Sequence, residues 1–93
     1  MAIIYKVTNL KNQKVYIGQT IHSLDKRIKN HITEARNEKK PTPFHAAILK
    51  YGIDSFKVEI IETVEVEELN EREIYWIDYY DSYYNGYNAT LGG

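Results

Sequence analysis

Hydrophobic and polar residues alternate along three segments of the chain, and this pattern predicts three β-strands. The segments are residues 3–8, 14–20 and 56–64. In the first of them Ile3, Tyr5 and Val7 share one face. A short polar turn at residues 10–13 separates the first two segments, so these two strands should pair as an antiparallel hairpin.

Two helices are predicted between the hairpin and the third strand. Ser23 is a suitable N-cap for a helix that reaches about residue 37, and Asp25 lies in its favourable first turn. Thr42 and Pro43 provide a cap and a first-position proline for a short helix that Gly52 ends. The apolar stripe of the longer helix consists of Leu24, Ile28, Ile32 and Ala35.

A third helix is predicted from about residue 66 to residue 80, and it carries one acidic residue in its apolar stripe. The stripe is formed by Leu69, Trp76, Ile77 and Tyr80. Glu73 falls in the middle of it. A carboxylate that points toward the core loses its hydration unless something holds it. Three explanations of Glu73 are therefore open. It binds a functional ligand, it forms a structural ion pair with Arg27 or Arg72, or the helix is rotated so that the carboxylate reaches solvent.

The element order ββααβα predicts an α+β domain with a three-stranded antiparallel sheet flanked by helices. The 93 residues are 43% hydrophobic and 27% charged, which fits one globular domain over residues 1–93. The chain has no cysteine, so disulfides and thiolate metal sites are excluded. It also has no apolar run of membrane-spanning length, and we expect an intracellular, cytoplasmic protein with no membrane partner.

The net charge of −1 conceals an asymmetry between the two parts of the chain. Residues 1–57 hold eleven Lys or Arg and four Asp or Glu, a balance of +7. Residues 58–93 hold one Arg and nine Asp or Glu, a balance of −8. The basic part could attract a polyanion while the acidic part supplies carboxylates, although ordinary surface charge explains the same numbers.

Three features are candidates for chemistry. Glu73 is the first, and the second is the pair Arg27 and His31, which are four residues apart and border the stripe of their helix. The third is the hairpin, which carries one tyrosine on each strand, Tyr5 and Tyr16. Each feature has an ordinary structural explanation, namely a salt bridge, a helix-edge histidine and two sheet tyrosines.

Taken together, these groups are sufficient to hydrolyse a phosphodiester with one metal ion. Mg²⁺ keeps most of its waters and commonly uses only one or two protein carboxylates, so a lone glutamate is enough. A guanidinium matches the phosphate oxygens and balances charge that grows in the transition state. An imidazole or a phenol within reach can orient and deprotonate the attacking water.

The motifs themselves resemble those of the GIY-YIG nuclease domain. The hairpin reads "IIY" at residues 3–5 and "YIG" at residues 16–18, with the second tyrosine eleven positions after the first. The resemblance continues through Arg27 in "SLDKRIKNH", through "AILKYGIDSF" at residues 47–56, through Glu73 in "EREIYWI" and through Asn88 in "NGYN". One departure is Ile3, which stands where the family motif has its first glycine.

The resemblance implies a role for each matching residue. Tyr5 and Tyr16 would line the site and position or activate water, and Arg27 would contact the scissile phosphate. His31 would assist proton transfer. The metal ligand would be Glu73, holding Mg²⁺ or Mn²⁺, and Asn88 would help to order the site.

Further residues are candidates for DNA contact. Gly18 would let the DNA backbone or a side chain approach the second strand. Lys14 and Lys26 could neutralise phosphates. His45 lies in a region where relatives carry a histidine, and it either touches DNA or is a surface histidine.

The predicted function is that of a metal-dependent endonuclease that acts on double-stranded DNA, of the homing or phage-encoded type, in which case it works in the host cell. The alternative is a non-catalytic nucleic-acid-binding module on the same scaffold. We expect a monomer, with a transient dimer on DNA for double-strand cleavage. Because residues 91–93 follow directly on the last motif, we expect either a catalytic fragment or a stand-alone nuclease with little sequence preference.

Overall fold

The computed structural model describes residues 1–92 and confirms the predicted order of elements. Strands β1 (Ala2–Asn9) and β2 (Val15–Thr20) form the hairpin, and helices α1 (Leu24–Asn37) and α2 (Pro43–Tyr51) follow it. A 3₁₀ turn at Ile53–Ser55 leads into β3 (Phe56–Val64), and a second one at Val66–Glu68 leads into α3 (Leu69–Tyr80). In this described part of the chain no helix is both long and apolar enough to cross a bilayer.

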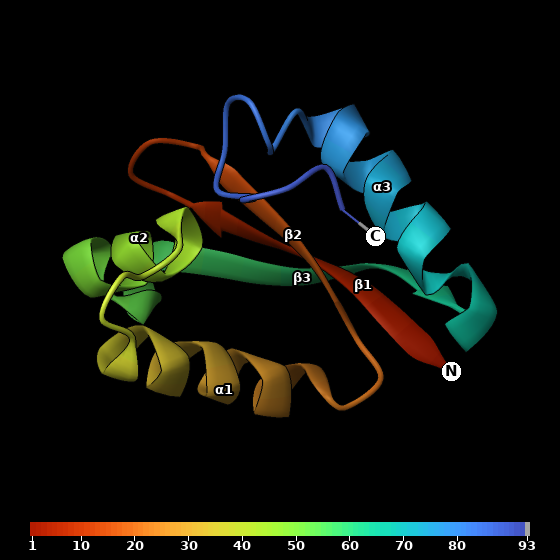
Figure 1. Ribbon diagram of the computed structural model, residues 1–93, viewed down its shortest axis with the longest axis horizontal. Helices are drawn as coiled ribbons and strands as arrows, with labels where there is room; N and C mark the ends of the chain where they lie inside the picture. Colours follow the sequence, from red (N-terminus) through yellow and green to blue (C-terminus); the bar gives the residue numbers. More distant parts are fainter. Residues whose placement is uncertain (93) are drawn as a thin grey trace.

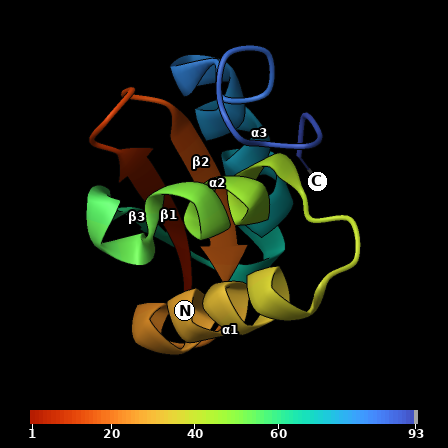
Figure 2. The same cartoon turned by 90° about the vertical axis from the view of Figure 1, so that its left-hand side faces the viewer.

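The sheet is antiparallel with the strand order β2-β1-β3, so β1 is the central strand. Helices α1 and α2 cover one face of the sheet and α3 covers the other (Figure 1 and, turned by 90°, Figure 2). Because β1 is covered on both faces, it buries residues of both parities rather than only the expected Ile3, Tyr5 and Val7 face.

Each face of the sheet has its own apolar core. The core beneath α1 and α2 contains Tyr5, Val7, Ala35, Phe44, Ala47, Ile48, Phe56 and Tyr87. The core beneath α3 contains Ala2, Ile4, Ile17, Val64, Leu69 and Ile77. A thin sheet therefore separates two small cores, and Tyr5 belongs to the one that contacts α1 and α2.

The helix ends follow local sequence rules, with one correction. Ser23 caps α1 through its side chain, and Thr42 caps α2 in the same way. Gly52 ends α2 at a φ of 80°. The predicted start of the third helix at residue 66 is wrong, since Val66–Glu68 forms a 3₁₀ turn before α3 begins at Leu69. No side chain caps α3, and a tightened first turn is a common way to begin such a helix.

Helix α3 is fixed to β3 by one carboxylate. Oε1 of Glu62 accepts hydrogen bonds from Arg72 Nε at 2.7 Å and from Trp76 Nε1 at 2.9 Å. These two bonds lower the pKa of the Glu62 carboxyl group.

The register between β1 and β3 shifts between Ile4 and Tyr5, a bulge of the kind that redirects side chains near functional sites.

Gly18 is required by the ring of Tyr5. The two residues are cross-strand partners in the hairpin, and a Cβ atom on Gly18 would lie 2.2 Å from Cζ of Tyr5. The glycine is buried beneath this ring. The sequence suggested that either the DNA backbone or a side chain approaches Gly18. In the structure the side chain of Tyr5 fills this space, so the expected DNA contact at Gly18 is corrected.

The segment after α3 returns along β2. The backbone N–H of Tyr87 donates to the carbonyl of Val15 at 2.9 Å. The side chain of Asn88 then accepts from the N–H of Ile17 at 2.8 Å and donates to the carbonyl of Ile17 at 2.9 Å. Asn88 therefore pairs with β2 as a short strand would.

We expect Gly18→Ala to lower the free energy of unfolding by about 1–3 kcal/mol, because the added methyl group overlaps the ring of Tyr5. Urea denaturation measures the loss. In a Tyr5→Ala background the same substitution should cost clearly less, since the ring is gone. An equal cost in both backgrounds would show that the contact with Tyr5 is not what requires the glycine.

Candidate active site

A cleft of about 290 Å³ gathers most of the residues that the sequence singled out. Its walls come from β2, α1, α2, α3 and the segment after α3, so it lies across the edge strand β2, where the two helical layers meet. The lining residues are Tyr16, Arg27, His31, Glu34, Glu38, Thr42, Phe44, His45, Glu73, Tyr87, Asn88, Ala89 and Thr90. Five of the six predicted catalytic residues are in this list.

Tyr5, the sixth, lies directly beneath the cleft rather than in its wall. Its side chain is fully buried, and its hydroxyl is hydrogen-bonded to Nε2 of His31 at 2.7 Å. His31 is itself only 2% exposed, so it points into the core instead of bordering the apolar stripe of α1. The expectations that Tyr5 lines the site and that His31 sits at a helix edge are both corrected by this buried pair.

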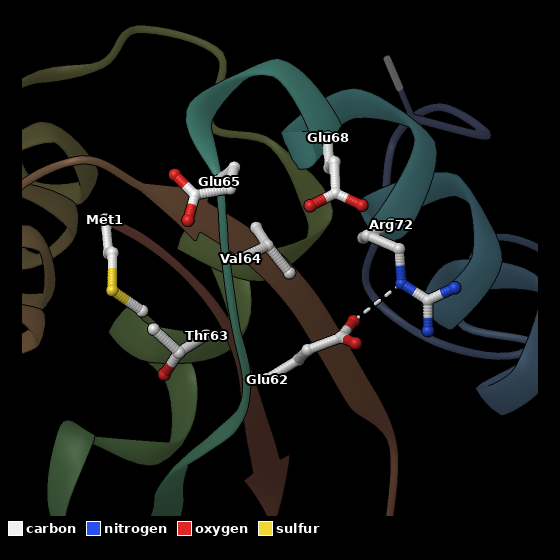
Figure 3. A pocket seen from close by; sticks show the side chains of 7 residues that line it. All are labelled: Met1, Glu62, Thr63, Val64, Glu65, Glu68 and Arg72. Carbon is white, nitrogen blue, oxygen red and sulfur yellow. Dashed lines mark hydrogen bonds and ion pairs between the residues drawn. The ribbon is translucent and has the colours of Figure 1, made fainter.

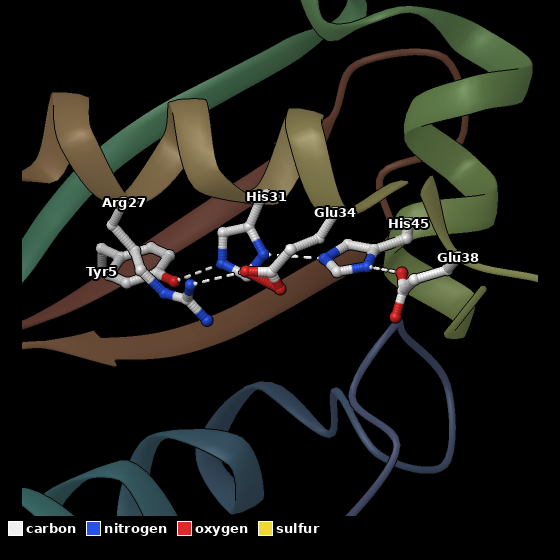
Figure 4. Close-up of polar contacts among 6 residues, drawn as sticks. All are labelled: Tyr5, Arg27, His31, Glu34, Glu38 and His45. Carbon is white, nitrogen blue, oxygen red and sulfur yellow. Dashed lines mark hydrogen bonds and ion pairs between the residues drawn. The ribbon is translucent and has the colours of Figure 1, made fainter. Parts of the chain in front are cut away.

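The hydrogen bond between Tyr5 and His31 is the first link of a chain of polar side chains (Figure 4). Nδ1 of His31 is hydrogen-bonded to Nε2 of His45 at 2.8 Å, and Nδ1 of His45 is hydrogen-bonded to Glu38. His45 is 5% exposed, so it is not a surface histidine. Its position beside His31 gives it a place in the site instead.

The carboxylate of Glu38 accepts from His45 and is consistent with one continuous set of donor directions along this chain. An ionised carboxylate only accepts, so His45 carries a proton on Nδ1, and in its singly protonated form it accepts on Nε2. His31 then donates from Nδ1 to His45, and its Nε2 accepts from the hydroxyl of Tyr5. In this arrangement all donors point from Tyr5 toward Glu38, and His31 is neutral.

Burial and charge set the electrostatics of the site. Burial, with help from Arg27 and His45, lowers the pKa of His31 to about 3. Burial also raises the pKa of Tyr5 and that of Tyr16, and the negative charge of Glu73 adds to both shifts. The two phenols and His31 are therefore uncharged at neutral pH.

Arg27 brings the positive charge to the cleft. Its Nη1 donates to Oε1 of Glu34 at 3.2 Å, and its side chain is 30% exposed. The nearby Tyr5 and Glu34 raise the pKa of Arg27 despite the opposing effect of its burial. Arg27 thus stays charged at a half-buried position.

Sequence reasoning missed Glu34 and Glu38. With Arg27 and His31 they occur at positions 27, 31, 34 and 38, a spacing that places polar groups on one face of a helix and its continuation. This repeated spacing was the available signal. The link to His45 has no such signal, because His45 arrives from another helix.

Glu73 and Asn88 reach the cleft from the side of α3. Glu73 is half-buried on the inward side of the helix, as the sequence predicted. A Cβ atom on Gly92 would lie 3.3 Å from Oε1 of Glu73, so the segment after α3 passes close to this carboxylate. Asn88 is 9% exposed and holds β2 next to Tyr16 through its two bonds to Ile17.

A larger hollow of about 410 Å³ lies elsewhere, between the start of β1, the end of β3 and the start of α3 (Figure 3). Three carboxylates line it, and its one guanidinium, that of Arg72, is bonded to Glu62. The cleft over β2 also has three carboxylates and one guanidinium, but unlike this hollow it holds phenols and imidazoles beside the guanidinium, so it is the better candidate for phosphate chemistry.

The cleft combines phenols, imidazoles, a guanidinium and three carboxylates on a small α+β scaffold, a composition suited to hydrolysis of a phosphate ester. Residues 1–88 match the family model described as the GIY-YIG catalytic domain. The chain therefore belongs to the GIY-YIG family. It is a nuclease domain of the type found in phage-encoded endonucleases.

Similar proteins agree with this assignment. Intron-associated endonuclease 1 of Enterobacteria phage T4 is 33% identical over 95 residues, which cover 96% of this chain and 38% of that protein. A putative MSV199 domain-containing protein of Invertebrate iridescent virus 6 is 36% identical over 64 residues, which cover 68% of this chain and 25% of that protein. The chain thus spans well under half the length of these relatives.

Solved structures show the same fold. The catalytic domain of the homing endonuclease I-TevI superimposes with a TM-score of 0.81 at 29% identity, covering 97% of this chain and 99% of that one. A point mutant of the catalytic domain of this intron endonuclease superimposes with a TM-score of 0.85, also at 29% identity, covering 100% and 98%. The three-stranded antiparallel sheet and its helices are therefore those of a GIY-YIG nuclease domain.

The low pKa of His31 predicts a pH-dependent stability. Below pH 6.5 the unfolded chain protonates this imidazole while the folded protein does not, until the pH approaches about 3. The free energy of unfolding should therefore fall as the pH decreases from 6.5 to 4, and it should fall less steeply in His31→Gln. Urea titrations in buffer with a chelator measure both curves. Parallel curves would mean that folding does not lower the pKa of His31.

Proposed function

We propose that this domain is a divalent-metal-dependent endonuclease that hydrolyses phosphodiester bonds of double-stranded DNA. The observation that carries the proposal is the convergence of Tyr16, Arg27 and Glu73 on one cleft, above the buried hydrogen bond between Tyr5 and His31. These groups come from four elements, and Glu73 on α3 is far in sequence from the other three. Core packing alone gives no reason for a guanidinium and a carboxylate to meet there.

Glu73 is the residue that would hold the metal ion. It is half-buried, it lines an open cleft and its charge acts on both phenols, so its carboxylate faces the site. One carboxylate at an open cleft is sufficient for Mg²⁺ or Mn²⁺, which keep most of their waters. When bound, the cation would supply charge neutralisation for the phosphate and the leaving oxygen.

Arg27 and Tyr16 would act on the substrate from the opposite wall. The half-exposed guanidinium of Arg27 can bind the scissile phosphate by two parallel hydrogen bonds and balance the charge that develops on it. Tyr16 carries its hydroxyl at the cleft, and its ring is stacked on Phe44 with centroids 4.0 Å apart. This stacking fixes the phenol in a position to orient the attacking water.

Tyr5 and His31 would receive the proton of that water from beneath Tyr16. Tyr5 donates its hydroxyl proton to Nε2 of His31, which leaves the phenol oxygen able to accept another. If the phenol passes its proton to His31, the resulting imidazolium is hydrogen-bonded to His45, which is in turn bonded to the carboxylate of Glu38. Through His45, the carboxylate of Glu38 would offset part of the cost that burial places on this imidazolium.

DNA would approach over the open side of the cleft. Lys14 and Lys26 are exposed and can contact backbone phosphates, which would make binding fall with increasing salt. The relatives include a phage homing endonuclease, which supports a homing or phage-encoded role inside the cell that holds the DNA. We propose a monomer that cuts one strand at a time or dimerises transiently on DNA.

The alternative is a non-catalytic nucleic-acid-binding module on the same scaffold. It would need the exposed lysines but not Glu73, and it would bind DNA without cutting it. Supercoiled plasmid incubated with and without Mg²⁺ separates the two functions, because only the nuclease produces nicked circles.

Glu73→Gln should abolish cleavage while folding and DNA binding persist, because the amide keeps the shape of the side chain and removes its charge. Plasmid nicking in Mg²⁺, gel-shift binding and thermal melting measure the three properties. Glu71→Gln, at an exposed position on the same helix, is the matched control and should cleave normally. Equal nicking by Glu73→Gln and the parent protein would rule out the metal role of Glu73.

Tyr16→Phe should lower the single-turnover cleavage rate by about 10²–10⁴-fold, the usual contribution of a group that positions or accepts a proton. The ring stacked on Phe44 remains, so DNA affinity and melting temperature should change little. Tyr75→Phe, at an exposed tyrosine of α3, is the control. A rate within a few-fold of the parent would remove the Tyr16 hydroxyl from the mechanism.

A further inference from the structure

Two histidines and a glutamate form a cluster in the wall of the cleft. The proposed reaction does not require these three side chains to act together. His31 and Glu34 lie three residues apart on α1, and His45 lies on α2. One nitrogen or oxygen atom from each of the three lies within 4.8 Å of the other two. Ligands at about 2.0–2.1 Å from a tetrahedral ion are roughly 3.3 Å apart, so small side-chain rotations would close the cluster around an ion.

Each member of the cluster also has the outer partner that metal ligands usually have. Tyr5 is hydrogen-bonded to the far nitrogen of His31 at 2.7 Å, and Glu38 is hydrogen-bonded to the far nitrogen of His45. The carboxylate of Glu34 accepts from Arg27 at 3.2 Å. Such outer hydrogen bonds orient the ligands, and the bond from His45 to Glu38 also raises the basicity of that imidazole. The near nitrogens, Nδ1 of His31 and Nε2 of His45, face each other at 2.8 Å.

The donor set identifies the kind of ion. Two imidazole nitrogens and one carboxylate oxygen suit Zn²⁺ and similar transition-metal ions, whereas Mg²⁺ prefers oxygen ligands alone. Because all three side chains line the cleft, a fourth position would be open to water. This donor set therefore differs in chemistry from the single carboxylate of Glu73.

We propose that His31, Glu34 and His45 bind one Zn²⁺-like ion, which takes the place of the proton that the two imidazoles share. The proton of His31 moves from Nδ1 to Nε2, and His31 then donates to the hydroxyl oxygen of Tyr5. No proton is lost, because His31 is neutral before and after. Tyr5 loses the acceptor for its own proton, so the ion blocks the path that the proposed hydrolysis uses.

Binding is tested with Co²⁺, which absorbs visible light when four-coordinate. Glu73→Gln is the host protein, so that the carboxylate assigned to Mg²⁺ does not contribute. Titration of this metal-free protein should give tetrahedral bands that saturate at one equivalent and disappear when Zn²⁺ is added. Absence of such bands would overturn the proposal.

Variants in the same host identify the ligands. His45→Ala and Glu34→Gln should remove the bands, and Glu38→Gln should weaken Co²⁺ affinity by about 10–100-fold, as expected for an outer partner. His22→Ala removes the exposed histidine before α1 and should leave the bands unchanged. Circular dichroism verifies folding, and Glu34→Gln gives a second answer if His45→Ala unfolds. Bands that survive both ligand substitutions, or that require His22, would overturn the assignment.

Inhibition is the functional consequence, and this part alone depends on the proposed nuclease activity. At saturating Mg²⁺, Zn²⁺ should inhibit plasmid nicking with a constant that matches its affinity in the binding experiment. For Glu34→Gln, measured against its own uninhibited rate, the inhibition constant should rise at least 10-fold. An unchanged constant would contradict the proposed block. A protein that binds Co²⁺ as described but never cuts DNA would refute the nuclease function and leave the metal site standing.

Discussion

The buried hydrogen bond between Tyr5 and His31 is the interaction on which the arrangement of the site depends. It joins the central strand to α1 within an apolar core, where an unpaired hydroxyl or imidazole would be costly. His31 in turn fixes the rotation of α1, and this rotation brings Arg27 and Glu34 to the cleft. Gly18 is the corresponding requirement on the neighbouring strand, because a side chain there would displace the ring of Tyr5.

The location of the cleft explains how a carboxylate from one helical layer reaches a guanidinium from the other. Helices α1 and α3 lie on opposite faces of the sheet, yet Arg27 and Glu73 line the same cleft. They meet because the cleft lies across the edge strand β2 rather than over a face. An edge site of this kind uses about two turns of α1 and one turn of α3, so the rest of both helices remains available for core packing.

Local rules were sufficient to predict most of the fold. Alternation identified the strands, Ser23, Thr42 and Gly52 marked the ends of two helices, and helical spacing placed Glu73 on the inward side of α3. The 3₁₀ turn at Val66–Glu68 was missed because periodicity does not distinguish a tightened turn from the first turn of an α-helix.

The second half of the site was harder to predict, because its partners meet only in the folded chain. His45 was predicted to be at the surface, and it is buried because α2 packs against α1 with this side chain between them. Ile3 stands where the family motif has its first glycine, and the strand accommodates it without irregularity. Ile3 pairs with Thr20 and Thr63 in a regular part of both ladders. The cross-strand space that the ring of Tyr5 needs is supplied by Gly18 instead.

The hydrogen bonds of the Asn88 side chain also affect how readily the sheet can pair with another protein chain. An open outer strand is a template on which a foreign strand can extend a sheet, and this is a common start of cross-β aggregation. On β2 the donor and the acceptor of Ile17 are already taken by Asn88, and the carbonyl of Val15 is taken by Tyr87. Another chain could pair with this part of β2 only after Tyr87 and Asn88 had dissociated from the strand, which would open the wall of the cleft. The same two hydrogen bonds that order the site therefore also protect the β2 edge of the sheet against pairing with another chain.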